Sequence, residues 1–117
     1  EIEFHRAMID IFTRAKIEAD YLATRYIQMV TELGGVKAAK KLINSDKPSE
    51  GYTALWERKR LDITVEALVQ NPKWAPLFVP AEIERAKQRL KEYGYDIVEG
   101  QLYSPPRGQF YSPLFLR

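Results

Sequence analysis

Cysteine is absent from the 117-residue chain, and histidine occurs only once, as His5. Without thiols the chain cannot form disulfide bonds, zinc–thiolate sites or a cysteine nucleophile, and a reducing cytoplasm is the expected location. A zinc site needs three or four ligands, so His5 with Glu1 four residues before it supplies half a site at best. We therefore expect neither a metal nor a cofactor, and we expect His5 at the surface or at the edge of the core.

Long apolar runs are lacking as well. No stretch approaches the roughly 20 consecutive apolar residues that a membrane-spanning helix needs, and no signal-peptide pattern is present. The first residue is Glu1 and not Met, so we expect a processed or excised fragment. With 45% hydrophobic and 29% charged residues, the composition is that of one globular domain, long enough to bury a core.

The residue sets that catalysis requires are sparse. The serines lie in expected loops without a glycine elbow, and His5 is the only imidazole that could serve as a base. Neighbouring carboxylates such as Glu82 and Glu84 point to different faces of a helix. No glycine loop of the phosphate-binding kind follows a strand, and Gly34-Gly35 is most simply a helix stop. An enzyme is therefore less favoured than a binding module.

Apolar residues recur at helical spacing through most of residues 1–95. Glycine and proline mark several ends: Gly34-Gly35 after the second helix, Pro80 at the start of the last helix, and Gly94 after it. The expected helices cover residues 2–19, 22–33, 36–43, 53–59, 65–70 and 81–93. The predicted fold is all-α, a single compact bundle of five or six short helices over residues 1–95, followed by an extended tail over residues 96–117.

The stretch GYTALWERKRLDITVEALV, residues 51–69, is expected to form a helix–turn–helix corner that organises the domain. Thr53 is the expected cap of its first helix, and Asp62 or Thr64 that of its second. Trp56 is expected to be largely buried, with its N–H bonded, because its ring offers a large apolar area. The corner would then anchor the core through Trp56.

The same corner is rich in charge. Glu57 and Arg60 lie three residues apart and can pair on a helix surface. For Arg60 and Asp62 two interpretations stand side by side. In the simpler one they fasten the corner; in the other they form a ligand site.

The order of motifs resembles a small family of uncharacterised bacterial all-helical domains. The resemblance rests on FHRAMIDIFTRAK, ATRYIQMV, GGVKAAKKLI and LWERKRLDITVEALV, and it covers about residues 4–95. It implies a domain type and no reaction, and suggests a unit that works beside other domains. One departure is Lys59, where relatives usually carry Gly, which argues against a tight left-handed turn at this position.

Basic residues are concentrated in residues 36–60, which hold seven Lys and Arg against three Asp and Glu. The expected helix 22–33, the Gly-Gly turn and the helix 36–43 resemble a helix-turn-helix in layout. A joint cluster would bind phosphates and lose affinity as salt rises, although no Asn, Gln or Arg on the second helix would read bases. The candidate binding residues are Lys37, Lys40, Lys41, Arg58, Lys59 and Arg60.

The tail combines prolines with many apolar residues, too many to leave in water as one patch. We expect it to dock in a groove between helices of its own chain or of a neighbouring copy. The candidate interface residues are Phe110, Tyr111, Leu114, Phe115 and Leu116. The favoured function is thus a small helical interaction module that binds a protein partner or itself; nucleic-acid or nucleotide-phosphate binding through the basic cluster is the alternative, and no membrane partner is expected.

Overall fold

The computed structural model describes residues 1–95, and all regular structure in this part of the chain is helical. The prediction of an all-α fold is confirmed. Most of the expected helices lie within two or three residues of their predicted bounds. The elements are α1 (Ile2–Ala19), α2 (Thr24–Leu33), α3 (Gly35–Asn44), α4 (Glu50–Glu57), the 3-10 helix η1 (Leu61–Ile63), α5 (Val65–Leu68), the 3-10 helix η2 (Pro72–Leu77) and α6 (Pro80–Glu92).

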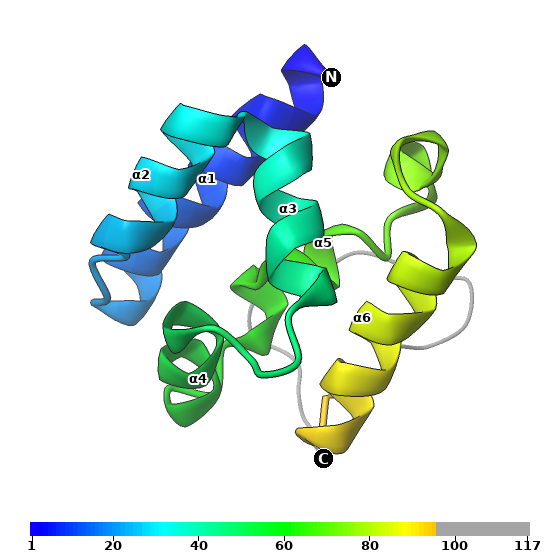
Figure 1. Cartoon of the computed structure of the whole chain (residues 1–117). Helices are drawn as coiled ribbons and strands as arrows, with labels where there is room; N and C mark the ends of the chain where they lie inside the picture. The colour runs from blue at the N-terminus through cyan, green and yellow to red at the C-terminus, as the bar shows by residue number, and fades with distance from the viewer. Residues whose placement is uncertain (96–117) are drawn as a thin grey trace.

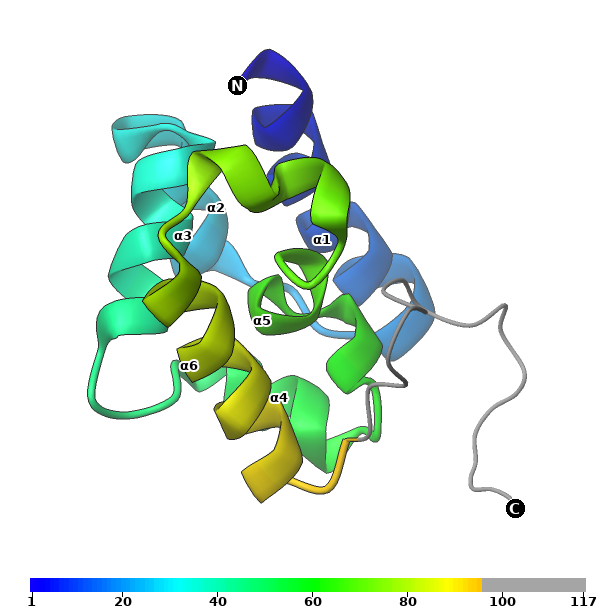
Figure 2. The ribbon, with the colours of Figure 1, turned by 90° about the vertical axis from the view of Figure 1, so that its right-hand side faces the viewer.

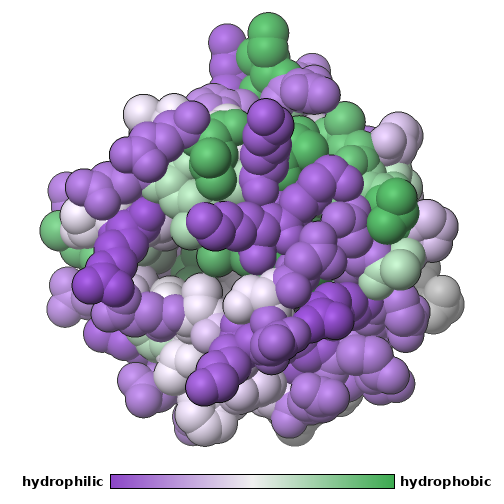
Figure 3. Space-filling view, viewed as in Figure 1, coloured by the Kyte–Doolittle hydropathy of each residue, from purple (hydrophilic) through white to green (hydrophobic). Residues whose placement is uncertain are grey.

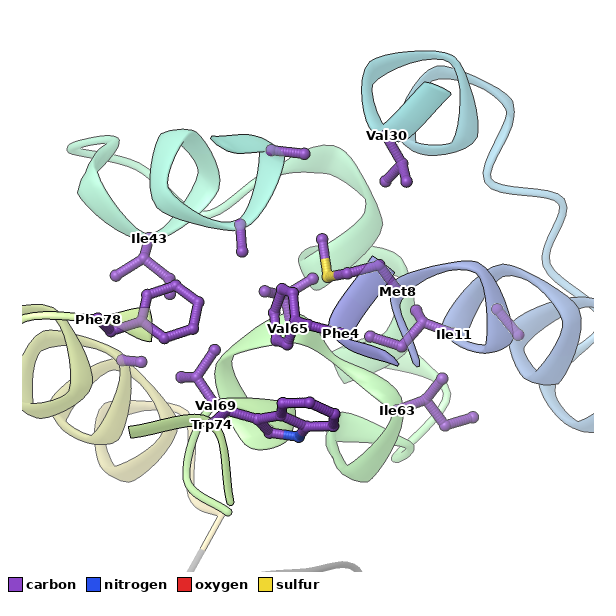
Figure 4. Packing of buried hydrophobic residues seen from close by; sticks show 14 of the residues in the cluster. Phe4, Met8, Ile11, Val30, Ile43, Ile63, Val65, Val69, Trp74 and Phe78 are labelled. Atoms are coloured by element: carbon purple, nitrogen blue, oxygen red, sulfur yellow. The ribbon is translucent and has the colours of Figure 1, made fainter. Parts of the chain in front are cut away.

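The helices surround a main core, with the short α5 near its centre (Figures 1 and 2). A second, smaller cluster of buried residues consists of Tyr52, Leu61 and Leu90. α1 and α2 lie side by side, and α3 crosses between them and α6 (Figure 1). From α1 the core receives Phe4, Met8, Ile11 and Ala15, which recur every three or four residues on one face of the helix. Figure 4 shows side chains of α3, α5 and η2 converging on this face.

Hydroxyl or amide side chains cap the starts of α4, α5 and η2. Ser49 accepts a hydrogen bond from the backbone N–H of Tyr52 and so begins α4, which makes the prediction of a cap at Thr53 wrong. Thr64 caps α5, as expected, by accepting from the N–H of Ala67. The other candidate cap, Asp62, instead lies inside η1. A start at Ser49 brings the buried Tyr52 into α4 together with Leu55.

Gly34 and Gly35 join α2 to α3, and glycine is needed at each of the two positions for a different reason. Gly34 has a φ of 87°, in the region that favours glycine. Gly35 allows a close approach, because a Cβ atom there would lie 2.8 Å from the Cα of His5. The N–H of Gly35 donates to Nδ1 of His5 at 3.0 Å. His5 is half-buried, as predicted, and holds the start of α3 against α1.

Lys59 adopts the left-handed conformation, with a φ of 61°. The prediction that a lysine at this position argues against a tight turn is therefore wrong. The turn ends α4, and the Lys59 N–H donates to the carbonyl of Trp56. A side chain with a Cβ atom is strained in this region, where glycine is not.

Lys59→Gly should therefore raise the free energy of unfolding, by up to about 1 kcal/mol, since the left-handed penalty of roughly 1–2 kcal/mol exceeds the entropy cost of glycine. Ala54→Gly, in the middle of α4, is the matched control and should lower the free energy of unfolding by about 1 kcal/mol. Urea unfolding measures both. A destabilised Lys59→Gly variant would mean that the lysine side chain stabilises the turn through its contacts.

Three residues expected to face the core do not. Trp56 is 43% exposed, Leu22 58% and Leu33 40%. Leu22 precedes the first residue of α2, so helical spacing does not apply to it, and Leu33 is the last residue of α2. Trp56 is the residue before the last of α4. Its ring packs edge-on against Tyr93, with ring centroids 5.4 Å apart.

Candidate binding pocket

The predicted basic residues of α3 differ in their surroundings. Lys37 and Lys41 are exposed. Lys40 is half-buried; its Nζ lies 2.8 Å from a carboxylate oxygen of Glu82 and 5.1 Å from the centre of the Phe78 ring. Lys40 thus joins α3 to α6.

The three basic residues after α4 lie elsewhere. Arg58 donates to the carbonyl of Ala19 at 3.0 Å, at the end of α1, and Lys59 forms the turn. The start of α3 lies instead against His5, near the other end of α1. Fourteen residues of helix separate the two points, about 21 Å at the usual helical rise. The structure therefore does not bring Lys37 and Arg58 into one patch, and nucleic-acid binding stays a prediction.

Arg60 belongs to a compact network of four charges. Its guanidinium binds both oxygens of Asp62 at 2.9 and 3.0 Å and reaches Glu18 at 2.7 Å. Arg14 also binds Glu18, at 3.0 Å, and approaches Asp62 at 3.4 Å. The hydrogen bond from Arg14, helped by Arg60, lowers the pKa of Glu18 to about 2. Two cations and two anions compensate one another, so this arrangement fits the interpretation that Arg60 and Asp62 fasten the corner to α1.

A pocket of about 440 Å³ opens between the α1–α2 connection, α2, α4 and α5. A hollow with an apolar and weakly polar floor and a hydrophilic border is visible near α2, α3 and α4 in Figure 3. Its size falls within the range typical of ligand sites. The apolar part of its wall comes from Ile11, Ala15, Leu22, Ala23, Met29, Leu42, Leu55 and Val65.

Three hydroxyl groups of the wall are already bonded within the chain. The Tyr26 hydroxyl donates to the Met8 carbonyl at 2.7 Å, and the Tyr52 hydroxyl donates to the Arg89 carbonyl at 3.1 Å. Burial raises the pKa of both tyrosines above the ordinary value. Thr64 donates to the Leu61 carbonyl at 2.6 Å. These groups make the pocket a neutral, largely apolar site.

A buried ion pair closes one side of the pocket. Glu66, which lines it, binds Arg89 with an N–O distance of 3.1 Å, and the two side chains are 4% and 8% exposed. Arg89 also donates to the carbonyls of Leu42 and Ser45, at 3.2 and 2.6 Å. Burial raises the pKa of Glu66, while the hydrogen bond from Arg89 acts in the opposite direction. The pair links α3, α5 and α6 without adding net charge.

The border of the pocket is exposed and mixed in character. Leu22 is 58% exposed, and Arg25 and Glu50 lie on opposite sides with 3.8 Å between their charged groups. Both charged side chains are largely in water, where such a pair contributes little to stability. The border can therefore rearrange around an occupant at low cost.

Sequence reasoning did not identify this pocket. Its lining comes from segments between residues 11 and 66, and no spacing rule connects them. One signal that could have indicated the pocket is the presence of tyrosines at positions 21, 26 and 52. A partly buried tyrosine places a polar tip beside an apolar ring, as the wall of a binding pocket requires. The predicted interface residues Phe110, Tyr111, Leu114, Phe115 and Leu116 lie outside the described residues.

Comparisons with protein-family models, curated proteins and solved structures found no match to the chain. Within residues 1–95, no helix has the length and apolar character needed to cross a bilayer. The same residues contain no group of three or more acidic or histidine side chains placed to hold a metal ion.

Proposed function

We propose that this chain is a helical interaction module whose pocket receives an apolar polypeptide segment, and that residues 110–116 are that segment. The observation that carries the proposal is an open, neutral, apolar pocket beside an exposed Leu22. The module has a binding role and no catalytic one.

The chemistry of the pocket supports an apolar occupant. The hydroxyls of Tyr26, Tyr52 and Thr64 already have partners, and Glu66 is paired with Arg89. A polar ligand beside these groups would therefore lose hydrogen bonds to water without regaining them. Leucine and phenylalanine side chains fill such a space at no comparable cost.

The length of the chain supports residues 110–116 as the source. Phe110 lies fifteen positions after Tyr95, the last described residue. At full extension this stretch spans about 50 Å, more than the 39 Å of the longest dimension of the described part. The segment can therefore reach the pocket of its own chain or that of a neighbouring copy.

Removing residues 100–117 should leave the pocket empty and so increase binding of a neutral apolar dye such as Nile red. We expect fluorescence to rise several-fold relative to the full chain, since an open apolar site takes up the dye. A synthetic peptide of residues 108–117 should reverse the rise. Equal dye fluorescence in the two chains, or a peptide without effect, would overturn the proposal.

Gly51→Leu in the shortened chain is the matched control. A Cβ atom on Gly51 would meet Tyr21 and Ser49 at an ordinary 3.9 Å, and Gly51 lines the pocket, so we expect a leucine side chain here to occupy part of the pocket. This variant should stay folded and lose the gain in dye binding. If the segment docks in its own chain, the deletion lowers the midpoint of thermal unfolding at unchanged mass; if it docks in a neighbour, the mass in solution falls to that of a monomer.

A further inference from the structure

The ion pair with Arg89 uses only part of the Glu66 carboxylate. Nη1 of Arg89 donates to Oε2 of Glu66 at 3.1 Å, and no other residue among 1–95 donates a hydrogen bond to this carboxylate. The backbone N–H of Glu66 itself is a further donor. A carboxylate accepts about four hydrogen bonds, so Glu66 can take another donor. It is therefore an exception to the apolar character of the pocket.

The unused oxygen, Oε1, faces the pocket. Within the described part of the chain, the only side-chain polar atom that is both shut off from solvent and without a partner is Nε1 of Trp74. Oε1 of Glu66 has no partner residue, so it must have accessible surface. The residue as a whole is only 3% exposed and lines the pocket, which is the space that Oε1 can reach.

Two tyrosines of the pocket wall lie within reach of the same charge. Burial, and after it the negative charge of Glu66, raises the pKa of the Tyr26 hydroxyl and of the Tyr52 hydroxyl. Both hydroxyls donate their protons elsewhere, to the carbonyls of Met8 and Arg89. The wall thus places an acceptor among aromatic rings and gives it no donor of its own.

The charges around this acceptor select a neutral donor. A cation or an anion would leave water for a site where the buried Glu66 and Arg89 cancel each other, so its lost hydration would not be compensated. Arg25 and Glu50 at the border are largely in water, where their charges act weakly. A neutral O–H group adds no charge and forms a charge-assisted hydrogen bond to the carboxylate.

We propose that the pocket selects a phenol, whose O–H donates to Oε1 of Glu66 while its ring lies against the apolar wall. The proposal rests on the function proposed above, and in this chain it assigns the contact to Tyr111. Within residues 110–116, Tyr111 is the only residue with both an aromatic ring and a donor. The two phenylalanines offer a ring without a donor, and the serine offers a donor without a ring.

Tyr111→Phe in the full chain removes only the hydroxyl. Nile red competes with the segment for the pocket, so the dye concentration at half-saturation measures how firmly the segment docks. This concentration should fall about tenfold in Tyr111→Phe, because one charge-assisted hydrogen bond is lost. Tyr103→Phe is the matched control, since Tyr103 begins the other Tyr-Ser-Pro sequence of the chain, and it should leave the concentration unchanged.

Two small probes test Glu66 itself. p-Cresol and toluene differ by one hydroxyl, and both can be measured by displacement of Nile red from the full chain. p-Cresol should bind several-fold more tightly than toluene, whereas a pocket without an acceptor prefers toluene, because the hydroxyl loses its hydrogen bonds to water. In the double variant Glu66→Leu, Arg89→Met the preference should reverse. Circular dichroism of each variant shows whether it is folded.

Equal half-saturation of Tyr111→Phe and Tyr103→Phe would overturn the assignment to Tyr111, and a wild-type preference for toluene would overturn the phenol site. Failure of the proposed function has a different signature. If deletion of residues 100–117 increases dye binding but Tyr111→Phe has no effect, the segment docks without this bond. If the deletion has no effect but p-cresol is preferred, the phenol specificity stands and the segment is not its natural source.

Discussion

Replacing Arg89 by Met should lower the free energy of unfolding by about 3–5 kcal/mol, the range for breaking a buried ion pair from one side. Arg89 is 7% exposed and binds Glu66 and the carbonyls of Leu42 and Ser45. The variant leaves the Glu66 carboxylate in the interior without its cation. Methionine fills much of the space of the arginine stem. The loss of unfolding free energy therefore comes mainly from the missing charge and hydrogen bonds and not from a cavity. Urea unfolding measures it.

The loss should depend on pH. Burial already raises the pKa of Glu66, and removing Arg89 takes away a hydrogen bond that lowers it. A carboxyl whose pKa is higher in the folded state loses stability as pH rises from the unfolded value towards the folded one. The Arg89→Met variant should therefore be closer to wild type at pH 5 than at pH 7.

The double variant Glu66→Leu, Arg89→Met is the control. Replacing both partners by apolar residues leaves no unpaired charge, so it should cost less than Arg89→Met alone. If the double variant is as unstable as the single one, the loss of stability comes from packing and from the missing hydrogen bonds to the carbonyls of Leu42 and Ser45. A pH-independent loss would mean that Glu66 does not become the uncompensated group.

The helices could be predicted because they depend on local spacing. The stripe of α1 recurs every three or four residues, and Pro80 marks the start of α6, so these bounds follow from neighbours in the sequence. The cap of α4 shows where this reasoning is limited. Ser49 and Thr53 both offer a hydroxyl four residues apart, and only the packing of Tyr52 and Leu55 decides between them.

The pocket and the charged network depend on contacts between distant residues. Arg14 meets Asp62 across 48 positions, and Arg89 meets Glu66 across 23. Periodicity assigns each residue to a helix face, but it does not say which faces meet. Lys59 adds a different case, since its left-handed turn is imposed by the packing on both sides and contradicts the preference of the residue itself.

The choice of the core tryptophan shows the same limit. The chain has two, and sequence reasoning assigned Trp56 as the buried organiser because its ring offers a large apolar area. In the structure Trp74 is 8% exposed and packs on Phe4, whereas Trp56 is 43% exposed. The difference arises because η2 folds back over the start of α1, an arrangement that no local pattern signals.

Phe4→Ala should consequently be far more destabilising than Trp56→Ala. Phe4 is fully buried and contacts the rings of Trp74 and Phe78 edge-on, with centroids 5.2 and 5.4 Å away. Its truncation leaves a cavity between α1 and η2, with an expected loss of about 3–5 kcal/mol.

Trp56→Ala is the matched aromatic truncation at a partly exposed position. It removes the edge-on contact with Tyr93 and some partly buried area, with an expected loss of about 1–2 kcal/mol. Thermal and urea unfolding of both variants give the comparison. Equal losses would place Trp56 in a core of its own and restore the corner of residues 51–69 as the organising element. If only Phe4→Ala lowers the free energy of unfolding strongly, the contact between α1 and η2 organises the fold.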